Sequence, residues 1–338
     1  MPLGLVVRYR DAGVDIDAMD SVKLRISRLV KPTYTPQVLS DIGLFGSLVR
    51  VPRMRDPVLV ASCDSLGTKA LVARMTGRFD TVGIDIVNHS VNDILTLGAR
   101  PLFFLDYIGH ADLSDRQFEE IISGLARACR ANSCPLVGGE IAMMPDVYKS
   151  GDFDLAGFIV GVVERRRIVD AKRLRPGDIA IGIPSSGLHT NGYTLARKVL
   201  FEHAGLTVRS RVKGLETTLG QALLRPHRSY LKPVYPLLPR LKALAHITGG
   251  GFYDNIRRLL PFETSCVIHK DAWRPGPLFR LIQRLGSVPE DEMYRVFNMG
   301  IGMVLFCARE EARTVLNRIR GSRVIGKVVR GTFGVAVI

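Results

Sequence analysis

The chain has 338 residues, of which 46% are hydrophobic and 23% are charged. This composition is typical of a folded globular protein and excludes a disordered chain, and the length suits about two domains of ordinary size. No apolar run approaches the ~20 residues that a transmembrane helix needs, and residues 1–13 lack the apolar core and cleavage site of a signal peptide. We therefore expect a cytoplasmic protein that does not bind a membrane.

The chain is strongly basic, because 47 lysines and arginines face 32 aspartates and glutamates, a formal net charge of +15. Such a charge attracts either nucleic acid or small polyanionic substrates. The densest basic segment, residues 164–178, contains no aromatic residue and matches no nucleic-acid-binding module. We therefore interpret this segment as a solvated basic linker and do not expect binding to nucleic acid.

The first half alternates strand-like and helix-like segments. Residues 114–133 predict an amphipathic helix capped by Ser114, and residues 81–99 begin as a strand and then turn helical. The apolar run at residues 57–62 predicts a buried strand. Further strands are predicted at residues 100–109, 134–140 and 154–164.

The second half also alternates strand-like and helix-like segments, after a basic connector that turns at Pro176-Gly177. We predict a strand at residues 179–186, a helix at 192–205, a proline-interrupted helix at 229–243, a strand at 265–269 and one or two edge strands at 323–338. The whole pattern predicts a two-domain α/β protein of the α+β type, with domains at residues 1–168 and 169–338.

Three acidic residues stand where predicted strands end, namely Asp64, Asp93 and Glu140. Ligands gather at the carboxyl ends of strands in α/β folds, and carboxylates suit a Mg²⁺ ion that carries a nucleotide phosphate. Lys69 would then offset the remaining phosphate charge. In the alternative interpretation, Asp64 caps the following helix and Asp93 is a solvated helix residue.

The turn at residues 185–197 combines small hydroxyl residues with Asn191 and His189 ahead of a predicted helix. Such a helix start is suited to binding an anion, and His189 is suited to donate to a phosphate or to titrate. The alternative is a turn histidine without a ligand.

Three consecutive glycines, Gly249–Gly251, precede another predicted helix. Glycines permit positive φ and leave backbone N–H groups free, as a phosphate cradle requires. A tight structural turn would also use glycines, although three in a row exceed what a turn needs.

Eight blocks in this order resemble the aminoimidazole ribonucleotide synthetase (phosphoribosylformylglycinamidine cyclo-ligase) family over nearly the whole chain. The blocks are YRDAGVDIDA (9–18), GIDIVNHSVNDI, GARPLFFLDY, LVGGE, DLAGFIVGVVE, SSGLHTNGY, AHITGGGFYDNI and EMYRVFNMGIGM. The resemblance implies ATP-dependent closure of formylglycinamidine ribonucleotide to aminoimidazole ribonucleotide in de novo purine biosynthesis. In that family ATP phosphorylates the formamide oxygen, the amidine nitrogen attacks the activated carbon, and phosphate leaves.

The resemblance also implies a homodimer in which the N-terminal sheets, each a half-barrel, join across the interface, so that residues 1–168 bind ATP and dimerise. It implies ATP and Mg²⁺ as cofactors, K⁺ as a further candidate, and a phosphoribosyl substrate. Carried over by motif position, the catalytic residues would be Asp93, His189, Asn191 and Lys69, and the Mg²⁺ ligands would be Asp64, Asp93 and Glu140. The nucleotide- and phosphate-binding residues would be Asp64, Gly67, Thr68, Lys69, Asn92, Asp93, Gly138, Gly139, Ser186, Gly249, Gly250 and Gly251.

The chain departs from the family pattern near these residues. The family loop G-T-D-G-V-G-T-K has Ser65 and Leu66 where Gly-Val stands, and a family glutamate after G-G-E is Met143. An Ala-Met-Cys stretch before V-N-D is replaced by Asn88, His89 and Ser90. The alternative is therefore a divergent paralogue that acts on another amide, or a catalytically silent nucleotide-binding dimer.

Overall fold

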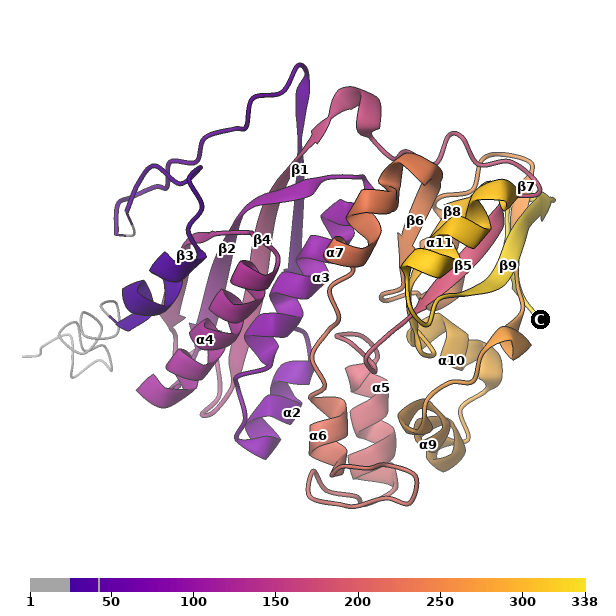
Figure 1. The fold of residues 1–338 in the computed structure, drawn as a ribbon. Coiled ribbons are helices and arrows are strands. Elements are labelled where there is room, and N and C mark those ends of the chain that lie inside the picture. Colours follow the sequence, from indigo (N-terminus) through magenta and orange to yellow (C-terminus); the bar gives the residue numbers. More distant parts are fainter. Residues whose placement is uncertain (1–24, 42) are drawn as a thin grey trace, which may run out of the picture.

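The computed structural model describes residues 25–41 and 43–338, and these residues form two halves that are each built on a β-sheet (Figure 1). The sequence block at residues 9–18 lies outside the described residues. Within the described part of the chain, no helix is long and apolar enough to cross a membrane.

The first half contains a four-stranded sheet in the order β1-β4-β2-β3, and α3 and α4 cover one of its faces (Figure 1). Both β1 and β2 pair antiparallel with β4, and β2 pairs parallel with β3, so β1, β2 and β3 all run in one direction. The elements are β1 (Pro57–Ser65), α2 (Lys69–Thr76), α3 (Val82–Thr96), β2 (Arg100–His110), α4 (Asp115–Ala131), β3 (Leu136–Met143) and β4 (Phe153–Glu164), preceded by the short 3₁₀ helix η2 (Lys31–Thr33).

The second half contains a six-stranded sheet in the order β10-β7-β9-β5-β8-β6. All of its pairs are antiparallel except β10 with β7. Its strands are β5 (Ile179–Pro184), β6 (Leu241–His246), β7 (Thr264–Ile268), β8 (Ile301–Cys307), β9 (Arg323–Arg330) and β10 (Val335–Val337). Its helices are α5 (Tyr193–Arg197), α6 (Leu219–Leu223), α7 (Leu231–Val234), α8 (Gly251–Arg257), α9 (Pro277–Gly286), α10 (Glu290–Val296) and α11 (Ala312–Arg318). A π-helical turn, η4 (Lys198–His203), extends α5, and 3₁₀ turns lie at η3 (Arg165–Arg167), η5 (Tyr235–Arg240), η6 (Lys270–Ala272) and η7 (Arg309–Glu311).

The mixed α/β fold with two sheets is confirmed, and so is the cap of α4, where Ser114 and Gln117 form a complete capping box. The predicted strand at the start of residues 81–99 is wrong, because α3 is helical from Val82 onward. This helix is buried on almost all sides, so its first turns lack the alternation of apolar and polar residues that marks a surface helix. Gly83 allows α4 to approach closely, since a Cβ there would lie 2.3 Å from the carbonyl oxygen of Ile121.

Two strand predictions also need correction. Strand β1 is not buried: its side chains alternate between exposed and half-buried, and Leu59 is 58% exposed. Strand β9 is not an edge strand, because it lies between β7 and β5, whereas β10 does form the edge. Arg323 and Lys327 are exposed although β9 is an internal strand.

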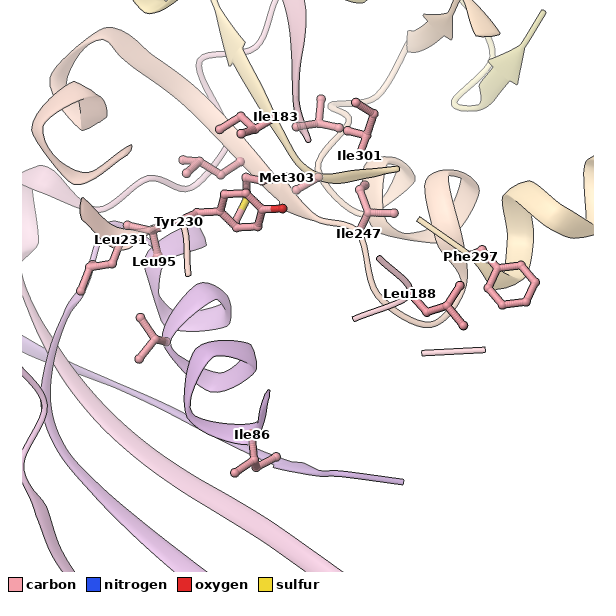
Figure 2. Packing of buried hydrophobic residues seen from close by; sticks show 14 of the residues in the cluster. Ile86, Leu95, Ile183, Leu188, Tyr230, Leu231, Ile247, Phe297, Ile301 and Met303 are labelled. Carbon is pink, nitrogen blue, oxygen red and sulfur yellow. The ribbon is translucent and has the colours of Figure 1, made fainter. Parts of the chain in front are cut away.

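The two halves meet over a continuous apolar core (Figure 2). Tyr230 is completely buried there, and its hydroxyl donates to the carbonyl oxygen of Pro184 at 3.1 Å. Gly302 makes room for this ring, since a Cβ would lie 2.1 Å from the Tyr230 hydroxyl. Packing of this kind fixes α3 against the second half and so fixes the polar junction described next.

Candidate active site

One face of α3 carries five polar side chains at helical spacing: Asp85, Asn88, His89, Asn92 and Asp93. Four of them are buried and Asp93 is half-buried, because this face packs against segments of the second half. Buried polar groups need hydrogen-bond partners, and each of these five has at least one. The junction between the two halves is therefore a polar layer inside an apolar core.

The two asparagines of this face hold the segment that precedes α7. Asn88 Nδ2 donates to the carbonyl oxygen of His227 at 2.7 Å, and Asn88 Oδ1 accepts from Asn132 Nδ2 at 2.8 Å. Asn92 Nδ2 donates to the carbonyl oxygen of Arg228 at 2.8 Å, and its Oδ1 accepts from the Tyr230 N–H at 2.8 Å. Asn92 is fully buried, so in this conformation it joins the two halves and is not open to a nucleotide.

Lys69 is not placed as the sequence predicted. Its side chain is completely buried, and Nζ contacts Asp85 Oδ2 at 2.8 Å and the carbonyl oxygens of His189 and Arg225 at 2.9 and 3.1 Å. An ammonium group has three N–H donors, so these three acceptors satisfy it. The position expected to face a phosphate is thus occupied by a lysine that fastens α2 to α3 and to the second half.

Four of the seven histidines converge at this junction: His89, His189, His227 and His246. The Nε2 atoms of His227 and His246 are 3.0 Å apart, and the rings of His189 and His227 stack with centroids 3.9 Å apart. His246 Nδ1 is 2.7 Å from Asp93 Oδ1. Burial is the main cause that lowers the pKa of His189, His227 and His246, so these three imidazoles are neutral near pH 7.

His89 lies between two carboxylates, since its Nε2 is 3.4 Å from Asp64 Oδ1 and 3.4 Å from Asp93 Oδ2. Burial opposes the charged form of His89, but the hydrogen bond and charge of Asp93, together with Asp64, raise its pKa overall. Burial raises the pKa of Asp64 to about 6. Burial acts in the same way on Asp93, but His246 and His89 outweigh it and hold the pKa of Asp93 well below its usual range. The structure therefore brings two of the three predicted metal-ligating acids together.

Glu140, the third acid, does not join them within one chain. It is exposed on β3, which lies three positions from β1 in the sheet, or about 14 Å at the usual strand spacing. Gly139, its neighbour, is needed for packing, because a Cβ there would lie 2.5 Å from Asp106 Oδ1. Gly138 is half-buried beside Ser47.

His189 and Asn191 lie at the same junction. Backbone N–H of Ser186 donates to His189 Nε2 at 3.2 Å, whereas the buried Nδ1 has no hydrogen-bond partner in the described part of the chain. Asn191 is half-buried, and its Oδ1 lies 3.5 Å from where a Cβ on Gly249 would stand. The predicted turn at residues 185–197 and the glycine turn are therefore spatial neighbours.

Two of the three turn glycines have a packing role as well. Gly250 and Gly251 have φ of +89° and +58°, and a Cβ on Gly251 would lie 1.9 Å from the carbonyl oxygen of Tyr294. Asn255 Nδ2 donates to the carbonyl oxygen of Gly251 at 2.8 Å and so holds the turn closed. The alternative interpretation, a tight structural turn, thus accounts for Gly250 and Gly251, while Gly249 faces Asn191.

The remaining predicted residues lie in the loop after β1 and in the turn after β5. Gly67 is exposed with φ of +62°, and Thr68 Oγ1 is 3.1 Å from Thr194 Oγ1. Ser186 Oγ donates to the carbonyl oxygen of Pro226 at 2.5 Å. The contact of Thr68 ties the loop after β1 to the start of α5, and that of Ser186 ties the turn after β5 to the segment before α7.

Sequence reasoning did not find three residues of the junction, namely Asp85, His227 and His246. The first had a detectable signal, because Asp85, His89 and Asn92 repeat at i, i+4 and i+7 on one helix face. His246 stands in the quoted block AHITGGGFYDNI but was not singled out. His227 lies in RPHRSY, outside any motif, and only the fold brings it to the site.

Both halves of the chain match models of a known protein family. The model of the AIR synthase related protein N-terminal domain matches residues 47–163, and the model of its C-terminal domain matches residues 175–338. The phosphoribosylformylglycinamidine cyclo-ligase of Syntrophotalea carbinolica is 46% identical over 330 residues, which cover 95% of this chain and 94% of that protein. The chain belongs to the AIR synthase family. Further relatives with the same name come from Myxococcus xanthus, 47% identical over 96% of each chain, and Thermoanaerobacter sp., 44% identical over 97% of this chain and 99% of that protein.

Solved structures share the fold of this AIR synthase family member at low sequence identity. Thiamine-monophosphate kinase from Stenotrophomonas maltophilia aligns with a TM-score of 0.69 at 17% identity over 96% of both chains. A hydrogenase maturation protein HypE, solved in complex with ATP, aligns with a TM-score of 0.62 at 18% identity over 92% of this chain and 86% of that one. At this identity the likeness is one of fold alone.

Proposed function

We propose that this chain is a phosphoribosylformylglycinamidine cyclo-ligase, which closes formylglycinamidine ribonucleotide to aminoimidazole ribonucleotide with ATP in purine biosynthesis. The observation that carries the proposal is identity of 44–47% over nearly the full length to relatives of that name. The site supports it, because Asp64, Asp93, His189 and Asn191 lie at one junction between the halves.

ATP and Mg²⁺ are the proposed cofactors, and the chain's own carboxylates fit the metal. Asp64 and Asp93 are 29% and 28% exposed and converge on one point beside His89, so they can bind an ion that enters from solvent. The ion would neutralise charge on the phosphoryl group during transfer. Glu140 remains a proposed ligand, and K⁺ a further candidate cofactor, for which the described residues single out no ligands.

The proposed phosphoribosyl substrate would lie near His189, Asn191 and Gly249. A phosphoryl-transfer site needs mainly positioning and electrostatic stabilisation, and neutral donors such as Asn191 and His189 supply positioning without adding charge. The net charge of +15 favours the approach of two anionic ligands, ATP and the ribonucleotide.

We also propose that the chain forms a homodimer through the face of the first sheet that α3 and α4 leave uncovered. On β1, Leu59, Ala61 and Cys63 are exposed on this face, and Phe158 of β4, paired with Cys63, is 41% exposed. A contiguous apolar patch of this kind is typical of an interaction surface. Joining two such sheets would complete the proposed barrel.

Phosphate release tests the function. The unmodified protein with ATP, Mg²⁺ and formylglycinamidine ribonucleotide is expected to release phosphate in a coupled assay, and Asp93→Asn is expected to lower the rate by about 100-fold or more. Asp146→Asn, which changes an exposed carboxylate, is the matched control and is expected to keep the rate. If the unmodified protein releases no phosphate, the chain is a silent nucleotide-binding dimer; release only with another amide would make it a paralogue.

A further inference from the structure

We propose that His89, Asp93 and His246, with Asp64 as a fourth ligand, bind a divalent transition-metal ion such as Zn²⁺ or Co²⁺ through imidazole nitrogen. The proposed Mg²⁺ would also use Asp64 and Asp93, so the two ions would compete for these carboxylates, and any use of the transition-metal ion in catalysis rests on the proposed function. Its binding does not rest on that function, since it follows from the arrangement of four side chains.

The ligand atoms have the spacing that such an ion needs. One atom each of His89, Asp93 and His246 lie within 4.8 Å of one another. His89 Nε2 is 3.4 Å from both Asp64 Oδ1 and Asp93 Oδ2. In a tetrahedral site with metal–ligand distances of about 2.0–2.1 Å, neighbouring ligand atoms stand about 3.3–3.4 Å apart. The two His89 pairs already have this spacing, whereas His246 Nδ1 and Asp93 Oδ1, which are 2.7 Å apart, must separate to admit an ion.

The imidazole of His89 is also turned in the required direction. Its Nδ1 is 2.7 Å from Thr190 Oγ1, which fixes the ring and leaves Nε2 to face the two carboxylates. An outer hydrogen bond of this kind is usual for a metal-binding histidine, because it selects the tautomer and orients the ring. On the far side, His246 Nδ1 holds Asp93 Oδ1 at 2.7 Å and would exchange this contact for the ion.

The site combines buried nitrogens with accessible oxygens. Both histidines are buried, while Asp64 and Asp93 keep more than a quarter of their side chains exposed and so leave a route from solvent. The two aspartates supply two negative charges that a divalent ion would balance.

The nitrogen ligands decide the class of ion. Mg²⁺ favours oxygen ligands and binds imidazole poorly, whereas imidazole suits Zn²⁺ and other transition metals. In the resemblance described above, His89 stands where the family pattern has methionine, so that pattern has no nitrogen ligand at this position of α3. Asp64 and Asp93 alone would form an oxygen site; His89 and His246 add two imidazoles to it.

The neighbouring histidine trio, His189, His227 and His246, is a weaker candidate. The rings of His189 and His227 stack with only 21° between their planes, so their in-plane lone pairs run side by side and do not converge. All three side chains are buried, and no carboxylate belongs to the group.

The experiment measures binding without turnover, so its outcome is independent of catalysis. Full-length metal-free protein is titrated with Co²⁺, whose visible absorption reports nitrogen ligands in a four-coordinate site, and bound Co²⁺ is then displaced by Zn²⁺ in competition with a chromogenic chelator. We expect one ion per chain. His89→Met is expected to weaken binding by about 10–100-fold or more. Removing a metal ligand should reduce the affinity for the ion at least as much as removing a residue that hydrogen-bonds to a ligand.

His203→Gln, which changes an exposed histidine, is the matched control and is expected to bind like the unmodified protein. His89→Gln, which keeps a similar size and a polar end, is the second variant should His89→Met fail to fold. The proposal is overturned if the unmodified protein shows no saturable binding, or if both His89 variants bind as tightly as it does. It is also overturned if His227→Gln abolishes binding while the His89 variants keep it, because the ion would then lie in the other trio.

Discussion

Lys69 and Asp85 form an ion pair with an Nζ–Oδ2 distance of 2.8 Å, and both side chains are completely buried. Asp85 Oδ1 also accepts from the N–H of His227 at 2.6 Å, and Lys69 Nζ donates to two carbonyl oxygens of the second half. Burial raises the pKa of Asp85 to about 6 and lowers that of Lys69, although each charge offsets part of the cost for the other. The pair therefore links α2, α3 and the segments around His189 and His227 in one network.

Lys69→Met should destabilise the protein strongly, because it leaves a buried carboxylate without its partner. We expect a loss of about 3–5 kcal/mol in the free energy of unfolding, measured by urea denaturation at pH 8. The double variant Lys69→Met, Asp85→Asn should recover part of this loss, since it removes the uncompensated charge. The matched control is the exposed pair of Arg165 and Asp56, 2.7 Å apart, where Asp56→Asn should cost no more than about 1 kcal/mol. An equal loss of unfolding free energy in Lys69→Met and in Asp56→Asn would contradict this account.

The position of the Lys69 side chain shows what the sequence could and could not predict. The loop after β1 was predicted to gather Asp64, Thr68 and Lys69 at a strand end, and the structure places all three there. The direction of the Lys69 side chain depends on Asp85, 16 positions further along the chain, and on carbonyl oxygens more than 100 positions away. No local pattern encodes such long-range partners, so the sequence predicted a lysine facing phosphate where the fold buries it.

A helix was predictable where its apolar residues repeat on one face, and was not predictable where the helix is buried on all sides. Helix α4 has one apolar face and a Ser114 cap, and it was predicted within two residues at each end. Helix α3 carries apolar residues at its start and polar residues that are also buried, so its first turns imitate a strand. Its polar stripe acquires partners only when the second half folds over it, which is why the histidine cluster could not be foreseen from spacing.

The apolar face of the first sheet gives a test of the proposed dimer. Leu59→Glu places a charge on the exposed face of β1, and burying it unpaired in an interface would be costly. We expect the unmodified protein to sediment as a dimer and the variant as a monomer at the same concentration. Val147→Glu is the control, because Val147 is 71% exposed but lies outside the strands of this sheet. A monomeric unmodified protein, or a dimeric Leu59→Glu variant, would argue against this interface.

Asp106 should make stability depend on pH. It is buried on β2, and burial raises its pKa to about 7 from the usual 3.8. The folded state therefore keeps a proton that the unfolded state has lost, so stability falls as pH rises from about 4 through about 7. At 1.36 kcal/mol per pH unit this amounts to about 4 kcal/mol.

Asp106→Asn keeps the shape of the side chain and cannot ionise. Urea denaturation between pH 5 and 8 should show a flatter profile for this variant than for the unmodified protein, with the variant more stable at pH 8. Asp146→Asn should leave the profile unchanged, because that carboxylate is exposed in both states. A variant that follows the unmodified profile would mean that Asp106 is ionised in the fold.

Gly251→Ala separates steric from conformational demands on the glycine turn. The backbone φ at Gly251 is +58°, which costs an L-residue about 1–2 kcal/mol, and the added Cβ would also lie 1.9 Å from the Tyr294 carbonyl oxygen. Gly77 is the matched control, since its φ is +65° and no atom of the described residues lies within 4 Å of where its Cβ would stand. We expect Gly77→Ala to lower the free energy of unfolding by the conformational cost alone. Gly251→Ala should lower it by about 1–3 kcal/mol more, because α8 must shift away from α10. Thermal unfolding of both variants measures the difference. Equal losses would show that α8 yields freely, and the glycine would then be explained by its φ and by the ligand proposed for this turn, not by packing.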